Sequence, residues 1–498
     1  MSNEPDTSTK ATSRYNRKTL NMLVFGLIAV IALLSLTGQD TDDPDDPDSV
    51  QSAETGPQLT IQAIDNISPE INLDWENPEV HHWINEAGAR VYLVTNREMP
   101  MLDIRMIFNA GSARDADTPG VAKLTNALLA AGTETVDATE VASGFEQVGA
   151  QFGLGAYRDM ALIRLRSLAE LNKLTAGLEL LANVVSAPAF PKDAVTRNKN
   201  QMLASITHSK QQPGSIASKA FYKALFTGHP YSIRGGGTAE SIPLIQPGNL
   251  SAFHKQHYVS QNLTIALVGA ISVNQAKQIA DRLTRDLPTG APATPLPDSP
   301  STAAIREHIE FDSNQTHILI GATAIKRGDP DHIPLMLGNE ILGGGALTSL
   351  LGQEIRQKRG LSYSVNSHFM PMQTQGPFQI GLQTRNDQTE QALAAIDQVL
   401  SQFIEQGPTP QQLADAKRQL IGHSLFSNAS NAGIAGQLGS VGFYQLPIDS
   451  VFKTQHKIQQ VTVEQVKDAF QRHLNPVELS IITVGKRIEM SDDKPESE

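Results

Sequence analysis

The side chains most often used for metal binding are sparse and poorly spaced in this sequence. His254 and His257 in FHKQHY are three residues apart, so on a helix both imidazoles could share one face. His81 and His82 are adjacent, a spacing that cannot direct both rings to one face. The second half of the chain has a single histidine, His473, at the place that matches the first pair. We therefore interpret both pairs as structural and assign neither of them a metal.

Motifs of several other chemistries are absent from the sequence. There is no G-x-S-x-G nucleophile elbow, no Walker loop and no dinucleotide fingerprint. The triple glycines at 235–237 and 343–345 do not follow a phosphate-loop pattern, and we expect them to form tight turns. Cysteine is also absent, which excludes disulfides and thiolate metal sites.

The segment 120–133, GVAKLTNALLAAGT, predicts a helix without metal-binding residues. Its apolar residues recur at helical spacing, and Gly132 is placed to end the helix. It contains no histidine, glutamate, aspartate or cysteine. This helix therefore has no side chain of the kinds that bind a catalytic metal ion.

Length and charge limit what the elements around this helix can be. A chain of 498 residues corresponds to two to four domains of about 100–200 residues each. The apolar fraction of 40% is enough for a sizeable core. The net charge is −12 and no basic stripe occurs, so nucleic acid is excluded as a partner.

The N-terminal region carries a targeting signal. Residues 20–36, LNMLVFGLIAVIALLSL, are apolar and uncharged, and basic residues in 1–19 precede them. Such a run is either a transmembrane anchor or a cleaved signal segment, and the following SLTGQD is a weak match to a signal-peptidase site. Basic residues before the run and an acidic linker at 37–59 after it predict a cytoplasmic tip and an exported bulk. In a bacterium this places the chain at the inner membrane with its bulk in the periplasm.

The remaining sequence divides into two domains and a tail. Five prolines at 287–304 predict a linker between an N-terminal domain at 60–286 and a C-terminal domain at 305–487. The acidic tail at 488–498, like the linker at 37–59, has the composition of a solvated, disordered segment.

The two domains resemble each other in sequence. NLTIALVGAISV (262–273) closes the first and ELSIITVGKRIE (478–489) closes the second, each after a helix with a histidine near its end. LTNALLAAG (124–132) likewise matches LGNEILGGG (337–345). Matched segments in the same order indicate a duplicated domain.

Helical and strand patterns alternate irregularly within each domain. RVYLVTNREMPMLDIRMIFNAGS (90–112) predicts two strands around an Asn-Arg-Glu turn. We expect an α+β fold of two homologous domains, each with a mixed or antiparallel sheet packed with helices.

Taken together, 120–133, GHPYSIRGGGT (228–238) and LGGGALTSLLGQEIRQKRGLSYSV (342–365) resemble the insulinase and pitrilysin class of zinc metallopeptidases, in the mitochondrial processing peptidase branch. The resemblance covers nearly the whole globular part. It implies a two-domain chain that forms half of a clam-like chamber with a second chain. In the family the first of these segments reads G-x-A-H-x-x-E-H: its histidines hold zinc, and its glutamate polarises the attacking water.

The family's zinc ligands are missing from the matching positions. Its first histidine falls on Lys123, its glutamate on Asn126 and its second histidine on Ala127. Its third ligand, a glutamate on a later helix, falls near Ala204, and residues 194–239 contain no carboxylate. A catalytic zinc needs three protein ligands, so we expect this chain to bind no zinc by itself.

The resemblance also implies a role for Arg356 and Tyr363. In the family an arginine and a tyrosine at these places bind the substrate and stabilise the oxyanion that forms when water attacks. Considered without the family, Arg356 could be a solvated helix cation and Tyr363 a half-buried strand residue.

Our hypothesis is that this chain is the zinc-free partner subunit of a heteromeric insulinase-family peptidase. A sibling chain would bring the zinc, and this chain would help to hold a peptide substrate through Arg356 and Tyr363. The alternative is a purely structural or peptide-binding subunit with no catalytic contribution. An independent peptidase with an unrecognised site is the third possibility.

Overall fold

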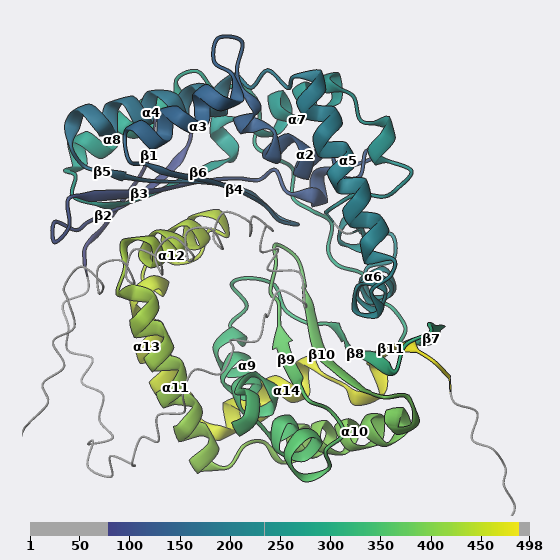
Figure 1. Ribbon diagram of the computed structural model, residues 1–498. Helices are drawn as coiled ribbons and strands as arrows, with labels where there is room; N and C mark the ends of the chain where they lie inside the picture. The colour runs from purple at the N-terminus through teal and green to yellow at the C-terminus, as the bar shows by residue number, and fades with distance from the viewer. Residues whose placement is uncertain (1–77, 234, 488–498) are drawn as a thin grey trace, which may run out of the picture. The chain divides into compact units, whose positions relative to one another are not determined.

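The computed structural model describes residues 78–233 and 235–487, which form two β-sheets packed with helices (Figure 1). The predicted segments 1–19, 20–36 and 37–59 and the tail 488–498 lie outside the described residues. Among the residues that are described, no helix combines the length and the apolar character needed to cross a membrane.

The first sheet has six strands in the order β1-β2-β6-β3-β5-β4. The second has five, in the order β7-β11-β8-β10-β9. The strands are β1 (Val80–Ile84), β2 (Arg90–Thr95), β3 (Met101–Phe108), β4 (Gln151–Ala156), β5 (Ala161–Leu168), β6 (Leu263–Gly269), β7 (Arg306–Glu310), β8 (Gln315–Thr323), β9 (Val365–Phe369), β10 (Pro377–Arg385) and β11 (Ser480–Gly485).

The two sheets share one topology, which confirms the duplication. If β1 is set aside, the order β2-β6-β3-β5-β4 matches β7-β11-β8-β10-β9 strand for strand. In each sheet only the first of these pairs is parallel, β2 with β6 and β7 with β11, and the rest are antiparallel. The expected α+β fold with mixed sheets is therefore confirmed.

The two strands predicted within 90–112 form as β2 and β3, but they do not pair with each other. The late strand β6 lies between them, parallel to β2 and antiparallel to β3. All seven residues of β6 are buried.

The helices of the first half are α2 (Val121–Ala127), α3 (Ala138–Gln147), α4 (Leu171–Ser186), α5 (Lys192–Ser209), α6 (Pro213–Leu225), α7 (Pro247–His257) and α8 (Val273–Thr284). Those of the second half are α9 (His332–Asn339), α10 (Thr389–Gln406), α11 (Pro410–Asn428), α12 (Asn431–Phe443), α13 (Ser450–Gln460) and α14 (Val463–His473). Two short π-helices, η6 (Glu340–Gly344) and η8 (Gly352–Lys358), lie between α9 and β9. All the described residues belong to one compact unit of the chain.

Each half lends one helix to the sheet of the other half. Figure 1 shows α3, α4 and α8 along one face of the first sheet and α12, from the second half, along the other. Ile434, Ala435 and Leu438 of α12 pack there against Ala266 and Val268 of β6. Helix α6 of the first half packs in the same way on β8 and β11 of the second sheet. Since α6 and α12 occupy matching places in the duplication, the exchange is reciprocal.

Candidate functional site

The helix predicted at 120–133 begins at a buried carboxylate. Asp115 accepts a hydrogen bond from the Gly120 amide at 2.7 Å and another from the Ala122 amide at 2.8 Å. Helix α2 runs over Val121–Ala127, a 3-10 turn continues it over Leu129–Ala131, and the chain leaves at Gly132 with φ +117°. Burial raises the pKa of Asp115 to about 7, although its two amide hydrogen bonds oppose that rise.

The positions that match the family's zinc motif are structured but have no ligand set. Lys123 is half-buried on α2, Ala127 is exposed, and Ala204 is exposed on the adjacent helix α5. Asn126 is buried, and its Nδ2 donates to the Tyr258 hydroxyl at 3.3 Å. An ammonium and two methyl groups cannot bind zinc, so the residues present do not fit this metal.

His254 and His257 are core side chains of α7. His254 Nε2 donates to the Val185 carbonyl at 2.8 Å, and its ring stacks on Tyr258. His257 packs against Phe253, and burial, reinforced by the charge of Arg114, lowers its pKa to about 4. Both imidazoles are therefore buried among core side chains rather than presented to a ligand.

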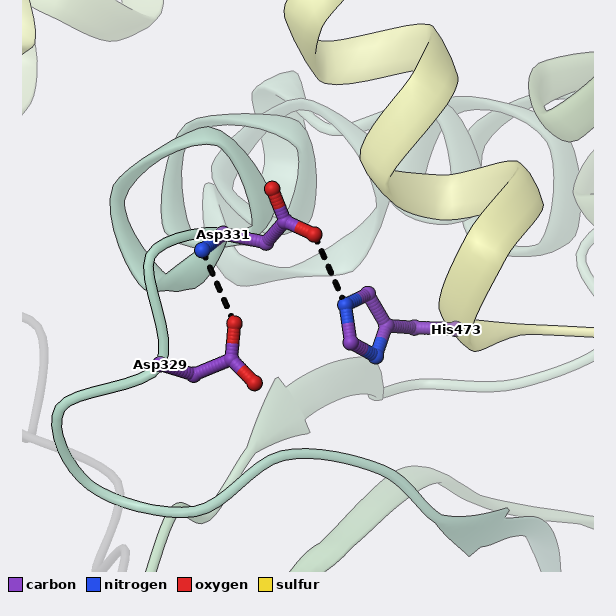
Figure 2. Close-up of side chains that lie close together, drawn as sticks. All are labelled: Asp329, Asp331 and His473. Atoms are coloured by element: carbon purple, nitrogen blue, oxygen red, sulfur yellow. Dashed lines mark hydrogen bonds and ion pairs between the residues drawn. The ribbon is translucent and has the colours of Figure 1, made fainter.

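Within the described part of the chain, one cluster has the spacing of metal ligands. Figure 2 shows Asp329, Asp331 and His473, whose potential ligand atoms lie within 4.8 Å of one another. Asp331 already has strong partners: Arg472 donates to both of its carboxylate oxygens, at 2.7 and 3.1 Å, and His473 Nε2 lies 2.9 Å from Oδ2. The hydrogen bonds from Arg472 hold the pKa of Asp331 below its usual range. The cluster therefore ties the start of α9 to the end of α14, and both carboxylate oxygens of Asp331 are already engaged in hydrogen bonds.

The structure brings Arg356 and Tyr363 together. Arg356 lies in the π-helix η8, and its Cζ is 4.5 Å from the centroid of the Tyr363 ring. The Tyr363 side chain is 79% exposed, so the ring is offered to solvent with the guanidinium stacked on it. π-Helical turns are rare and frequently mark functional sites.

The other cations at the end of η8, Lys358 and the following Arg359, have different partners. Lys358 and Arg359 both pair with Glu354, each at 2.9 Å, and Arg359 also donates to Gln398. Among the described residues, no carboxylate lies within ion-pair distance of Arg356, and its guanidinium contacts the Tyr363 ring instead. Arg356 is therefore the cation of this helix that could receive a negatively charged oxygen.

Both halves place an edge strand next to these positions. Among the described strands, β4 pairs only with β5 and contacts α2, while β9 pairs only with β10 and contacts η8. Strand β9 starts at Val365, two residues after Tyr363. The two matching edges of the duplicated fold thus lie beside the empty zinc helix and beside the Arg356–Tyr363 pair.

One important polar residue gave no signal in the sequence. Asp159, in the turn between β4 and β5, is 3% exposed. It accepts from the Tyr231 hydroxyl, from the Gln373 amide at 2.8 Å and from the Tyr444 hydroxyl at 3.1 Å. Its partners are up to 285 residues away in the sequence, so no local pattern could reveal this junction.

The fold, the degenerate zinc helix and the Arg356–Tyr363 pair together define an insulinase-type peptidase chain that lacks its own zinc ligands. Family comparison agrees: the model described as insulinase, peptidase family M16, matches residues 90–238, and the M16 inactive domain matches residues 245–420. The crystal structure of a peptidase M16 inactive domain from Pseudomonas fluorescens is 44% identical, covers 82% of this chain and 98% of that one, and has a TM-score of 0.80. The chain belongs to peptidase family M16.

Curated relatives are more distant, and their names differ. The Helicobacter pylori "non-peptidase homolog YmxG" is 26% identical, with 82% of this chain and 94% of the relative aligned. The Bacillus subtilis "uncharacterized zinc protease YmxG" is 23% identical, with 69% and 83% aligned. The names of the relatives thus include both a non-peptidase and a zinc protease.

Proposed function

We propose that this chain is the zinc-free partner subunit of a heteromeric insulinase-family zinc peptidase. The observation that carries the proposal is the exposed Tyr363 ring with the Arg356 guanidinium stacked on it. A chain without zinc ligands has no use for such a pair in chemistry of its own. The pair can act on a substrate if a sibling chain binds the zinc and a peptide lies between the two chains.

In this role Arg356 and Tyr363 act by donating hydrogen bonds. When water attacks a peptide carbonyl, the carbonyl oxygen acquires negative charge, and fixed donors stabilise that charge without reorganising. The guanidinium supplies charge and several N–H groups, while the phenol supplies one O–H. Their mutual stacking holds both donors in place before the substrate arrives.

The peptide would bind in extended form at a sheet edge. In the part of the chain that the structure describes, β4 and β9 have one neighbouring strand each, so their outer backbone groups can pair with an added strand. Such pairing fixes the peptide backbone whatever its sequence. With the sibling chain, the two-domain fold would form half of a clam-like chamber around the peptide.

The proposed location is the periplasmic side of a bacterial inner membrane. It rests on the sequence of residues 20–36 and on the charges that flank this segment. A heteromeric peptidase held there would act on exported peptides.

Copurification from membranes tests the proposal. The tagged full-length chain should be recovered from the membrane fraction together with a second chain that carries intact H-x-x-E-H, and the pair should contain zinc and cleave peptides. The chain purified alone should contain no stoichiometric zinc and should cleave nothing. One zinc per isolated chain, lost together with activity on chelation, would overturn the proposal, and recovery of the full-length chain from the cytosol would overturn the location.

The alternative is a peptide-binding subunit without a catalytic contribution. The exposed edge of β4 beside the ligand-free helix α2 favours it, because an edge strand can bind a peptide without cutting it. The alternative predicts the same copurifying chain, but a turnover that does not depend on Arg356 or Tyr363.

A further inference from the structure

A row of three residues crosses the first sheet and ends at its edge strand β4. Arg105 of β3 lies directly opposite Arg164 of β5, and Arg164 lies directly opposite Gly153 of β4. Residues directly opposite each other on paired strands share one face of a sheet, and here it is the face on which α12 packs (Figure 1). We call Arg105, Arg164 and Gly153 the arginine row.

Arg105, toward the centre of the sheet, is held by α12. Its Nη2 donates to the Ala432 carbonyl at 3.3 Å, and a Cβ added to Gly436 would lie 3.2 Å from its guanidinium carbon. Burial lowers the pKa of Arg105, and the nearby charge of Arg164 lowers it further. Like charges directly opposite each other on paired strands are destabilising, so the second arginine of the row weakens the sheet.

Arg164 is exposed and lies over the edge strand. A Cβ added to Gly153 would lie 2.4 Å from the Arg164 Nε and 3.1 Å from its Cγ, so Arg164 occupies the place that a side chain at position 153 would take. Among the described residues, no carboxylate lies within ion-pair distance of Arg164. The arginine row therefore ends over β4 in a cation that has no counter-charge in this part of the chain.

The neighbouring row on the same face is neutralised within the sheet. There Arg166 of β5 lies opposite Asp103 of β3, and the Arg166 Nε is 2.9 Å from the Asp103 Oδ1. Arg164 and Arg166 are thus two cations of one strand and one face, and only Arg166 has a partner built into the fold.

We propose that Arg164 binds the acidic side chain of a substrate peptide that pairs with β4. The inference rests on the proposed function, in which an extended peptide adds to this edge. Paired strands lie about 4.8 Å apart, so the peptide residue opposite Gly153 would stand beside the strand that Arg164 overlies. With its side chain on the α12 face, that residue would meet the guanidinium.

Charge complementarity identifies this side chain as a carboxylate. An aspartate or glutamate would relieve the repulsion between Arg164 and Arg105, and a planar guanidinium can donate two parallel hydrogen bonds to its two oxygens. A basic side chain at the same place would add a third positive charge to the row. Arg164 therefore adds a preference for acidic residues to a backbone pairing that is otherwise indifferent to sequence.

Peptide binding to the full-length chain in detergent tests the inference without any need for cleavage. The probes are short fluorescein-labelled peptides of alternating threonine and valine with an amidated C-terminus, which differ only in a central glutamate or glutamine. Fluorescence anisotropy should show that the wild-type chain binds the glutamate peptide about 5-fold more tightly, the upper end for one exposed charge pair. This preference should shrink as salt is added.

Three variants separate a contact with Arg164 from a general effect of charge. Arg164→Gln should bind the two peptides equally, whereas Arg164→Lys, which keeps a positive charge, should keep part of the preference. Arg282→Gln is the matched control, because Arg282 lies on α8, on the opposite face of the first sheet, where it pairs with Asp286 at 2.9 Å (Figure 1). This variant changes the net charge by the same amount and should leave the preference intact.

Two outcomes would overturn the role of Arg164 alone. One is a glutamate preference that survives in Arg164→Gln. The other is a preference for a free C-terminal carboxylate, measured with the glutamine peptide in its non-amidated form, in place of one for the central glutamate. If the wild-type chain binds none of these peptides, strand addition at β4 fails and this inference fails with it, while the dependence of turnover on Arg356 tests the zinc partnership separately.

Discussion

Arg356 and Tyr363 differ from the neighbouring cations and aromatic residues in what they contact. Most aromatic rings of the described residues pack in the cores, whereas Tyr363 is exposed and meets a guanidinium. Arg359, three residues after Arg356, is tied to Glu354 and Gln398. This difference between two arginines of one helix provides a matched control.

Removing the donors should lower turnover and leave assembly intact. Arg356→Ala and Tyr363→Phe should each reduce the turnover of the assembled complex by about 10²- to 10³-fold, as expected for loss of one oxyanion donor. Tyr363→Phe is the sharper change because the ring and its stacking remain and only the hydroxyl is lost. Peptide cleavage is measured beside complex formation by gel filtration.

Arg359→Ala removes a cation of the same helix that is already paired, so its turnover should stay near wild type. If Arg356→Ala and Tyr363→Phe also form normal complexes and cleave at the wild-type rate, the structural-subunit alternative replaces the catalytic one.

Asp115 should make stability depend on pH. Burial raises its pKa in the folded protein to about 7 from an unfolded value of 3.8, so folding favours its protonated form. The contribution of this pKa difference to the free energy of unfolding is therefore complete below about pH 4 and is lost as pH rises through 7. The asparagine of Asp115→Asn cannot ionise, although it loses one of the two amide acceptors.

Urea unfolding at pH 4 to 8 measures this effect. The difference in unfolding free energy between wild type and Asp115→Asn should shift in favour of the variant as pH rises from 4 to 7. A difference that is constant across this range would show that Asp115 stays ionised in the folded protein.

At the scale of elements, the periodicity of apolar residues predicts whether a segment is a helix or a strand, but not which other elements pack on it or pair with it. The helix at 120–133 was predicted from apolar spacing and Gly132, and it forms, shortened by a 3-10 turn. The insertion of β6 between β2 and β3 was not predicted, because pairing partners far apart in the sequence leave no local period. The sequence also did not predict that the helix with Arg356 is a π-helix, because its apolar spacing is that of an ordinary amphipathic α-helix.

The sequence contains a pattern that could have predicted the close packing of α12 on the first sheet. Gly436, Gly439 and Gly442 recur every three residues and so share one helix face. A Cβ at Gly442 would lie 2.4 Å from the Tyr92 ring and 2.5 Å from a methyl group of Thr264. These glycines let the helix approach β2, β3 and β6 more closely than alanine would.

Two glycine substitutions should therefore have opposite effects. Gly442→Ala overpacks the contact, which costs about 1–3 kcal/mol and outweighs a helix-propensity gain of about 1 kcal/mol. In α11, the Cβ added by Gly422→Ala has no atom within 4 Å, so this variant has only the gain in helix propensity. Thermal unfolding should show a lower Tm for Gly442→Ala and an equal or higher Tm for Gly422→Ala; equal Tm values for the two variants would contradict close packing of α12.

At the scale of the whole molecule, the two halves cannot be regarded as independent domains. Residues 288–305, all described, contain neither helix nor strand, and they are packed: the Pro297 carbonyl accepts from His229, and Ser299 bonds the Gln375 carbonyl. The buried Asp159 of the first half accepts from Gln373 and Tyr444 of the second. The exchanged helices α6 and α12 join the halves as well, since each packs on the sheet of the other half.

The exchange predicts that neither half is stable alone. A fragment that ends within 288–305 keeps the first sheet but loses α12, which exposes the apolar face formed by Val94, Ala266 and Val268. The second half alone loses α6 and exposes Leu319, Ile482 and Val484. Each fragment should therefore aggregate or bind a hydrophobic dye when expressed by itself. Coexpression of the two should restore a soluble complex, because each supplies the helix that the other lacks.

The intact chain from residue 78 onward should unfold in a single transition, since the loss of either sheet uncovers the other. Gel filtration, dye binding and calorimetry measure these outcomes. Two soluble fragments that unfold cooperatively on their own would show that the exchanged helices contribute little to the stability of either sheet.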